Sequence, residues 1–273
     1  EISDSEIDAR YNENKNDYDR VTYKYYLISG SATDDLSEEQ AMEQAKTKAE
    51  AAIAAEDLDA YIKSEFDSEL NETRYAAYSG VNSAFADWLF DESRVAGDKS
   101  SFEADNGYYV VVFEAKEDLH YNMVSVRHIL VRPSDTNSEE SWNEALSKVE
   151  GYLENLNTLG ANEENFGYLA MAYSDDSGSK ANGGLYSNIA KGQMVQEFED
   201  WCFNPSRKAG DVEIIKTSFG YHLMYFVSVD EDYYTYTVDN DIRSEEYSDY
   251  IDGIKDGYSV TDGAAKFMAA KHL

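Results

Sequence analysis

The chain has 273 residues, a length that suits about two ordinary domains, each with a core of its own. Hydrophobic residues make up 42% of it and aromatic residues 14%, which excludes a disordered polyelectrolyte although 29% of the residues are charged. The 23 basic and 55 acidic residues give a net charge of −32, which repels phosphate backbones, so we expect no nucleic-acid partner. No apolar run approaches the length of a transmembrane helix, so we expect no direct membrane insertion of this chain.

The first half begins with a polar stretch, and residues 1–18 predict a helical N-terminal linker. Residues 20–29, RVTYKYYLIS, are β-branched and aromatic and predict a strand. Ser37 and Gln40 have the spacing of a capping box, which indicates the start of a helix. The apolar positions that follow at helical spacing are Ala41, Met42, Ala45, Ala49 and Ile53.

The second half has a similar order of elements. After a predicted strand at 123–132, the sequence predicts in turn helices at 142–156 and 166–173, a glycine-rich loop at 174–184, a short helix at 198–203 and a last strand at 221–229. A strand, several helices and then further strands are typical of an α+β domain with a small sheet. Residues 233–273 are mostly polar and predict a C-terminal helical tail.

One segment of the first half recurs in the second. Residues 85–113 align without a gap with residues 198–226, and twelve of the 29 pairs are identical. This offset of 113 residues is too long for a solenoid repeat. The sequence therefore predicts two tandem domains of one fold, a first copy at 19–120 and a second copy at 121–232, flanked by the two terminal segments.

Two histidines of the second copy are the first candidates for chemistry. Alternation along a strand places His128 on one face with Val126 and Leu130, and His222 on a face with Met224. Buried histidines held by hydrogen bonds and catalytic histidines both fit this spacing, and spacing alone favours the former. Neither histidine has a cysteine or an acidic residue at the spacing of metal ligands, so we expect no metal site.

Five motifs of the second copy resemble, in order, those of the parvulin family of peptidyl-prolyl isomerases. They are RHILV (127–131), FGYLAMAYSDDSGSKANGG (166–184), KGQMVQEFEDWCF (191–203), AGD (209–211) and KTSFGYHL (216–223). The presence of two copies resembles extracytoplasmic foldases of the PrsA and SurA kind. The resemblance implies two small, mostly antiparallel sheets with surrounding helices.

The resemblance also implies the residues of an active site. It implies that His128 and His222 are paired core histidines, linked through the hydroxyl of Thr217. It places Asp176 beside the bond that isomerises. The implied substrate pocket consists of Met194 and Phe198 around the proline ring, Phe219 at the rim, and Tyr186 near the usual leucine of a GGDLG motif.

The first copy lacks most of this set. The residues that replace His128, His222, Thr217 and Met194 are Tyr25, Tyr109, Ala104 and Val81. The glycine-rich loop has no clear counterpart between Asp67 and Tyr78. We therefore expect the second copy alone to retain the chemistry.

The resemblance implies a function that needs no cofactor. We expect isomerisation of X-Pro bonds in unfolded or newly exported polypeptides, because turning an imide bond requires neither a metal nor a nucleophile. We expect a location outside the cytoplasm, and since Glu1 is not a methionine, a lipid anchor could lie in a segment before it. The alternative is a holdase or scaffold in which both copies bind polypeptide and neither turns over.

Overall fold

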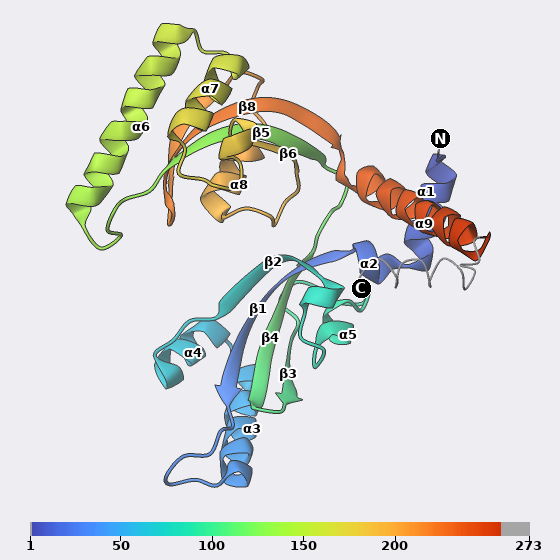
Figure 1. The fold of residues 1–273 in the computed structure, drawn as a ribbon. Helices are drawn as coiled ribbons and strands as arrows, with labels where there is room; N and C mark the ends of the chain where they lie inside the picture. The colour runs from blue at the N-terminus through green and yellow to red at the C-terminus, as the bar shows by residue number, and fades with distance from the viewer. Residues whose placement is uncertain (1, 258–273) are drawn as a thin grey trace, which may run out of the picture. The chain divides into compact units, whose positions relative to one another are not determined.

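The computed structural model describes residues 2–257, so residues 258–273 of the predicted tail lie outside the described residues. The chain divides into two compact units. Residues 19–233 form the larger unit, and among the described residues the smaller unit joins 2–18 with 234–257. Figure 1 shows the elements of both.

The smaller unit consists of helices from both terminal segments: α1 (Asp4–Glu13), α2 (Lys15–Tyr18) and α9 (Tyr233–Gly257). Arg10 of α1 forms ion pairs with Asp241 at 2.8 Å and with Glu245 at 2.7 Å. The ring of Tyr11 lies 5.2 Å from that of Tyr234. The sequence predicts both segments as helical but does not indicate that they pair, because Arg10 and Asp241 are 231 positions apart.

The larger unit contains two four-stranded antiparallel sheets, with strand orders β2-β1-β4-β3 and β6-β5-β8-β7. The strands of the first sheet are β1 (Arg20–Ser29), β2 (Asn71–Ala77), β3 (Lys99–Ala104) and β4 (Gly107–Lys116). Those of the second are β5 (Asn122–Val131), β6 (Leu185–Ile189), β7 (Val212–Thr217) and β8 (Gly220–Asp232). The predicted α+β fold class is confirmed.

Each sheet is accompanied by helices. Those with the first sheet are α3 (Glu38–Ala54), α4 (Leu58–Phe66), η1 (Tyr78–Gly80) and α5 (Ala86–Leu89). Those with the second are α6 (Glu139–Leu159), α7 (Glu163–Tyr173), η2 (Lys180–Asn182) and α8 (Gln196–Cys202). The predicted capping box of Ser37 and Gln40 is present at the start of α3, where each satisfies a backbone N–H of the other.

The second sheet buries both of its faces. Helices α6 and α7 cover one face, where Ile129 and Leu223 are buried with Phe166. Helix α8 covers the other, where Val126 and Met224 are buried with other apolar side chains. Because side chains alternate along a strand, His128 lies on the α8 face and Arg127 on the opposite one.

The two sheets share one hydrogen-bonding register in their last hairpin. Ala104 of β3 pairs with Gly107 of β4, and Thr217 of β7 pairs with Gly220 of β8, 113 positions later in each case. The two glycines have φ values of +148° and +146°, and a Cβ on either would lie within 2.3 Å of a carbonyl oxygen of the central strand. Only glycine fits such a position, so the repeated glycine preserves a close approach of backbones.

The central strands repeat their register as well. Tyr25 of β1 pairs with Val111 of β4, and His128 of β5 pairs with Met224 of β8. Val111 and Met224 are again 113 positions apart, which makes Tyr25 the structural counterpart of His128, as the sequence predicts.

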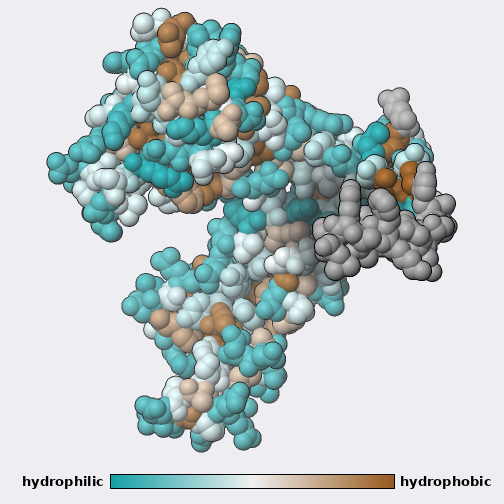
Figure 2. All heavy atoms as spheres, in the orientation of Figure 1, coloured by the Kyte–Doolittle hydropathy of each residue, from teal (hydrophilic) through white to brown (hydrophobic). Residues whose placement is uncertain are grey.

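The surface reflects the composition of the chain. Figure 2 shows hydrophilic colouring over most of the visible face, with apolar residues scattered among it. Among residues 2–257, no helix combines the length and the apolar character needed to cross a bilayer.

Candidate active site

A cavity of about 360 Å³ on the α8 face of the second sheet brings most of the predicted residues together. Its lining consists of His128, Leu130, Arg132, Asp176, Tyr186, Gln193, Met194, Val195, Phe198, Phe219 and His222. Seven of the eight predicted site residues are among them. The eighth, Thr217, lies behind the lining and is hydrogen-bonded to His222.

The two histidines lie on neighbouring central strands, β5 and β8. Their rings are stacked, with centroids 5.2 Å apart, and the two Nδ1 atoms are 3.0 Å from each other. Phe198 of α8 presents its ring edge-on to both, with centroids 5.4 Å from His128 and 5.6 Å from His222. All three side chains are at most 5% exposed, so this wall of the cavity is fixed by core packing.

The expected link between the histidines through the hydroxyl of Thr217 is wrong. The two rings are hydrogen-bonded to each other directly through their Nδ1 atoms. They can meet because β5 and β8 are adjacent and Leu130 of β5 pairs with His222. Thr217 ends β7, on the far side of β8, and its Oγ1 contacts Nε2 of His222 at 2.9 Å. The hydroxyl therefore ends the chain of hydrogen bonds rather than joining its two imidazoles.

Asp176 is held by several donors at one oxygen. Its Oδ2 is 3.0 Å from Nε2 of His128 and 3.0 Å from the hydroxyl of Tyr186, and it accepts from both the hydroxyl and the backbone N–H of Ser179. The hydrogen bond with His128, reinforced by Ser179 and Tyr186, holds the pKa of Asp176 well below its usual range, although burial opposes this effect. Asp176 is therefore a fixed anion at neutral pH.

Two neutral imidazoles can satisfy these contacts in one arrangement of protons. Nε2–H of His128 donates to Asp176, which leaves Nδ1 of His128 to accept from Nδ1–H of His222. Nε2 of His222 then accepts from the hydroxyl of Thr217, whose oxygen accepts from the backbone N–H of Phe219. Burial, with the proximity of His128, lowers the pKa of His222 to about 3, so this ring is neutral at physiological pH.

The mouth of the cavity is more open than its floor. Phe219, in the turn between β7 and β8, is 49% exposed, and the guanidinium of Arg132 lies 5.7 Å from the centre of its ring. Met194 lies in the segment before α8 and packs against the cluster that contains Phe198. Phe219 therefore borders the opening of the cavity, and Met194 lies in its wall beside Phe198.

Several contributors were not predicted. Leu130 of β5 and Arg132, the residue just after its end, follow His128 at every second position, so alternation along the chain could have found them. Gln193 and Val195 flank Met194 in sequence. Ser179 is 1% exposed in the 174–184 loop, and no periodic pattern marks it.

The described residues offer neither a cluster of three possible metal ligands nor an ionised thiol at this cavity. Among them, no three His, Cys, Asp or Glu side chains gather as a group that could hold a metal ion. Cys202 is buried on α8, and burial raises the pKa of its thiol to about 12, so it stays protonated. The site is thus a cavity with an apolar wall and with the carboxylate of Asp176 held in place at its side.

Comparison with known families agrees with this geometry. A family model described as the PPIC-type PPIASE domain matches residues 108–231. These residues are a parvulin-type peptidyl-prolyl isomerase domain. The match begins within β4 and ends within β8, so the parvulin domain includes the whole of the cavity described above.

The chain that carries this parvulin domain is similar to curated chaperones and foldases. "Chaperone SurA" of Pseudomonas putida is 32% identical over 123 residues, which are 44% of this chain and 27% of that protein. "Foldase protein PrsA 4" of Bacillus cereus is 34% identical over 128 residues, which are 46% of this chain and 39% of that protein. The chain thus spans well under half the length of these two relatives.

A solved parvulin structure is also similar. NmPin, the parvulin of Nitrosopumilus maritimus, is 33% identical, and the similarity covers 98% of that chain and 40% of this one, with a TM-score of 0.30.

The buried His222 of the parvulin domain predicts a dependence of stability on pH. Its pKa is about 3 in the folded state, against about 6.5 in an unfolded chain. Between these values the unfolded state binds a proton that the native state does not, so the contribution of His222 is full above pH 6.5 and is lost as the pH falls toward 3. We expect a slope of up to about 1.4 kcal/mol per pH unit from this residue.

Denaturant unfolding of the wild type and of His222→Gln between pH 4 and pH 7 measures this contribution. The variant should show a shallower decline in the free energy of unfolding with falling pH, whatever its absolute stability. His120→Gln is the control, because the side chain of His120 is 67% exposed. Equal slopes for the wild type and His222→Gln would contradict the prediction.

Proposed function

We propose that residues 121–232 catalyse cis/trans isomerisation of X-Pro bonds in unfolded polypeptides. The observation that supports this most directly is the combination of a 360 Å³ cavity with one fixed carboxylate beside its apolar wall. Met194 and Phe198 form a surface suited to a proline ring, with the histidine pair behind it. Phe219 borders the entrance of the cavity. Tyr186 of β6 holds the carboxylate of Asp176 with its hydroxyl.

The proposed mechanism is electrostatic and steric. A planar imide has partial double-bond character and carries partial negative charge on its carbonyl oxygen, and twisting the C–N bond reduces both. A carbonyl oxygen placed beside the ionised Asp176 is repelled more strongly in the planar state than in the twisted one. Because Ser179, Tyr186 and His128 fix the carboxylate, it does not need to reorganise during the reaction. The histidines act by holding this geometry, with no proton transfer to substrate.

We further propose that residues 19–120 are a parvulin-like domain without activity. The space that corresponds to the cavity holds aromatic side chains of the domain itself: the rings of Tyr25 and Tyr109 are 6.1 Å apart, and that of Phe85 is 5.3 Å from Tyr109. Residues 67–70 alone connect α4 to β2, where the second copy has the 174–184 loop between α7 and β6. The first copy thus has no segment that could supply a counterpart of Asp176.

We propose that the clients are unfolded or newly exported polypeptides, and that the protein works outside the cytoplasm. The relatives named as a chaperone and as a foldase support this assignment. The net charge of −32 is compatible with solubility in a salty exterior.

One observation favours a second candidate function. A copy that keeps the fold but not the site, as residues 19–120 do, is what a polypeptide-binding holdase would retain. In that reading both copies bind client segments and neither accelerates isomerisation.

A protease-coupled assay on a range of X-Pro peptides distinguishes the two. We expect the wild-type chain to accelerate an exchange that takes tens of seconds without a catalyst. A chelator should leave the rate unchanged, because no step uses a metal. If the folded chain gives no rate above background but suppresses aggregation of an unfolded client, the holdase is the correct function.

A further inference from the structure

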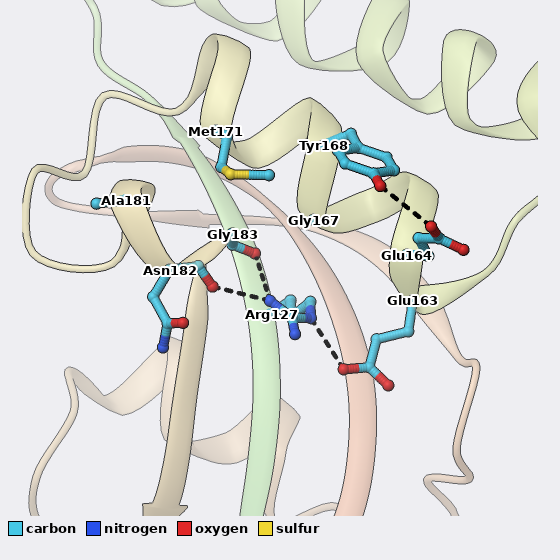
Figure 3. A pocket seen from close by; sticks show the side chains of 9 residues that line it. All are labelled: Arg127, Glu163, Glu164, Gly167, Tyr168, Met171, Ala181, Asn182 and Gly183. Atoms are coloured by element: carbon cyan, nitrogen blue, oxygen red, sulfur yellow. Dashed lines mark hydrogen bonds and ion pairs between the residues drawn. The ribbon is translucent and has the colours of Figure 1, made fainter.

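Arg127 makes a set of contacts that the proposed mechanism does not use. It precedes His128 on β5, so its side chain lies on the opposite face of the sheet, beside the start of α7. Its Nε donates to Oε1 of Glu163 at 3.0 Å, and its Nη1 donates to the carbonyl oxygens of Asn182 and Gly183, each at 2.9 Å. Figure 3 shows these bonds meeting at the guanidinium.

Two successive glycines, Gly183 and Gly184, approach this part of β5 closely. Gly183 has a φ of +66°, and a Cβ there would lie 2.8 Å from Nη1 of Arg127. Gly184 has a φ of +73°, and a Cβ there would lie 2.2 Å from the carbonyl oxygen of His128. The carbonyl oxygen of Gly184 accepts the backbone N–H of His128 at 2.9 Å. The turn thus contacts both the guanidinium of Arg127 and the backbone of His128.

The same turn is connected to the carboxylate of the site. The backbone N–H of Gly184 donates to the carbonyl oxygen of Ser179, and that of Lys180 donates to the carbonyl oxygen of Asp176, both at 2.9 Å. Ser179 and Asp176 in turn contact Nε2 of His128 at 3.1 Å and 3.0 Å. A short series of hydrogen-bonded turns therefore leads from the guanidinium to the site on the other face.

We propose that Arg127 is a positioning residue for isomerisation: it fixes the turn at 182–184 so that Asp176 and Ser179 meet His128. The proposal rests on the proposed isomerase function. The guanidinium suits this task because one planar group can donate in several directions at once, which a lysine ammonium on a flexible stem does less well.

The surroundings of Arg127 make the proposal testable without unfolding the domain. An open cavity of about 570 Å³ lies beside the guanidinium, lined in part by Glu163, Tyr168 and Met171. Water can reach the two carbonyl oxygens from there when the guanidinium is removed, so Arg127→Met should still fold. Glu163→Gln is the matched control, because it removes the ion pair and leaves both carbonyl contacts in place.

Two readouts on the full chain test the proposal. The first is kcat/KM in the X-Pro assay, which we expect to fall by up to about 10²-fold in Arg127→Met, less in Arg127→Lys and little in Glu163→Gln. The second is a carbon-13 NMR titration of the Asp176 carboxyl, a property that loss of stability alone would not move. We expect its pKa to rise toward the ordinary range in Arg127→Met and to stay low in Glu163→Gln.

The outcomes are separable. An unchanged Asp176 titration in folded Arg127→Met overturns the proposal, and so does a changed titration with an unchanged kcat/KM. If Arg127→Met does not fold, Arg127→Lys decides by the same two readouts. If the wild type itself shows no isomerase activity, the proposed function fails, and the titration still reports whether Arg127 positions Asp176.

Discussion

We expect Phe198→Ala to remove most of the isomerase activity and to lower the free energy of unfolding of the second copy by about 3–5 kcal/mol. The side chain of Phe198 is 3% exposed and contacts both histidine rings. Its removal therefore takes away the wall proposed to hold the proline ring and leaves a void in the core.

The first copy offers a matched control for this substitution. Phe85 is 2% exposed, and its ring lies 5.8 Å from that of Tyr23 and 5.3 Å from that of Tyr109. Phe85→Ala should therefore cost a similar free energy of unfolding and leave the activity intact. Both variants are to be assayed where denaturation curves show them folded. An equal loss of activity in Phe85→Ala would contradict the assignment of activity to the second copy.

The second large effect concerns Asp176. We expect both Asp176→Ala and Asp176→Asn to lower kcat/KM by on the order of 10²-fold, because the proposed mechanism depends on the charge of a preorganised group. The asparagine variant preserves shape and removes the charge. Folding should survive either change, because His128 and Tyr186 line the cavity and water can take the vacated hydrogen bonds.

The neighbouring carboxylate provides the control. Asp175 is exposed, does not line the cavity, and accepts the backbone N–H of Arg132 at 3.0 Å. Asp175→Asn should retain the wild-type kcat/KM. Full activity in Asp176→Asn would show that the charge is not what accelerates the reaction, and would leave the apolar wall as the main contributor.

Much of the fold could be predicted because a 29-residue segment of the sequence recurs, and the two sheets share the register of its hairpin. Identical residues that recur 113 positions later mark places where packing or backbone geometry permits little change, as Gly107 and Gly220 illustrate. Alternation along β5 was enough to put His128 on the cavity face. The pairing of α1 with α9 could not be predicted, because ion pairs between distant polar residues leave no periodic pattern.

The sequence predicts which residues form the site better than it predicts the hydrogen bonds between them. Seven of the predicted residues line one cavity, because the family motifs identify side chains. Motifs do not determine strand order. His128 and His222 form a direct hydrogen bond because β5 and β8 are adjacent in the sheet. Arg127 and Ser179 were missed for a related reason. Arg127 binds two backbone carbonyl oxygens, which no side-chain pattern records, and Ser179 lies in a loop without periodicity.

The contacts between α1 and α9 constrain the order in which the molecule folds. Arg10 cannot meet Asp241 until the ribosome has made more than 200 further residues, whereas strand pairs such as β3 with β4 are close in sequence. Both sheets can therefore form before α9 is available to α1, so the pairing of these two helices follows the pairing of the strands. During synthesis the ring of Tyr11 can pack against that of Tyr234 only once α9 has been made, so this side of α1 stays in contact with solvent while the sheets form.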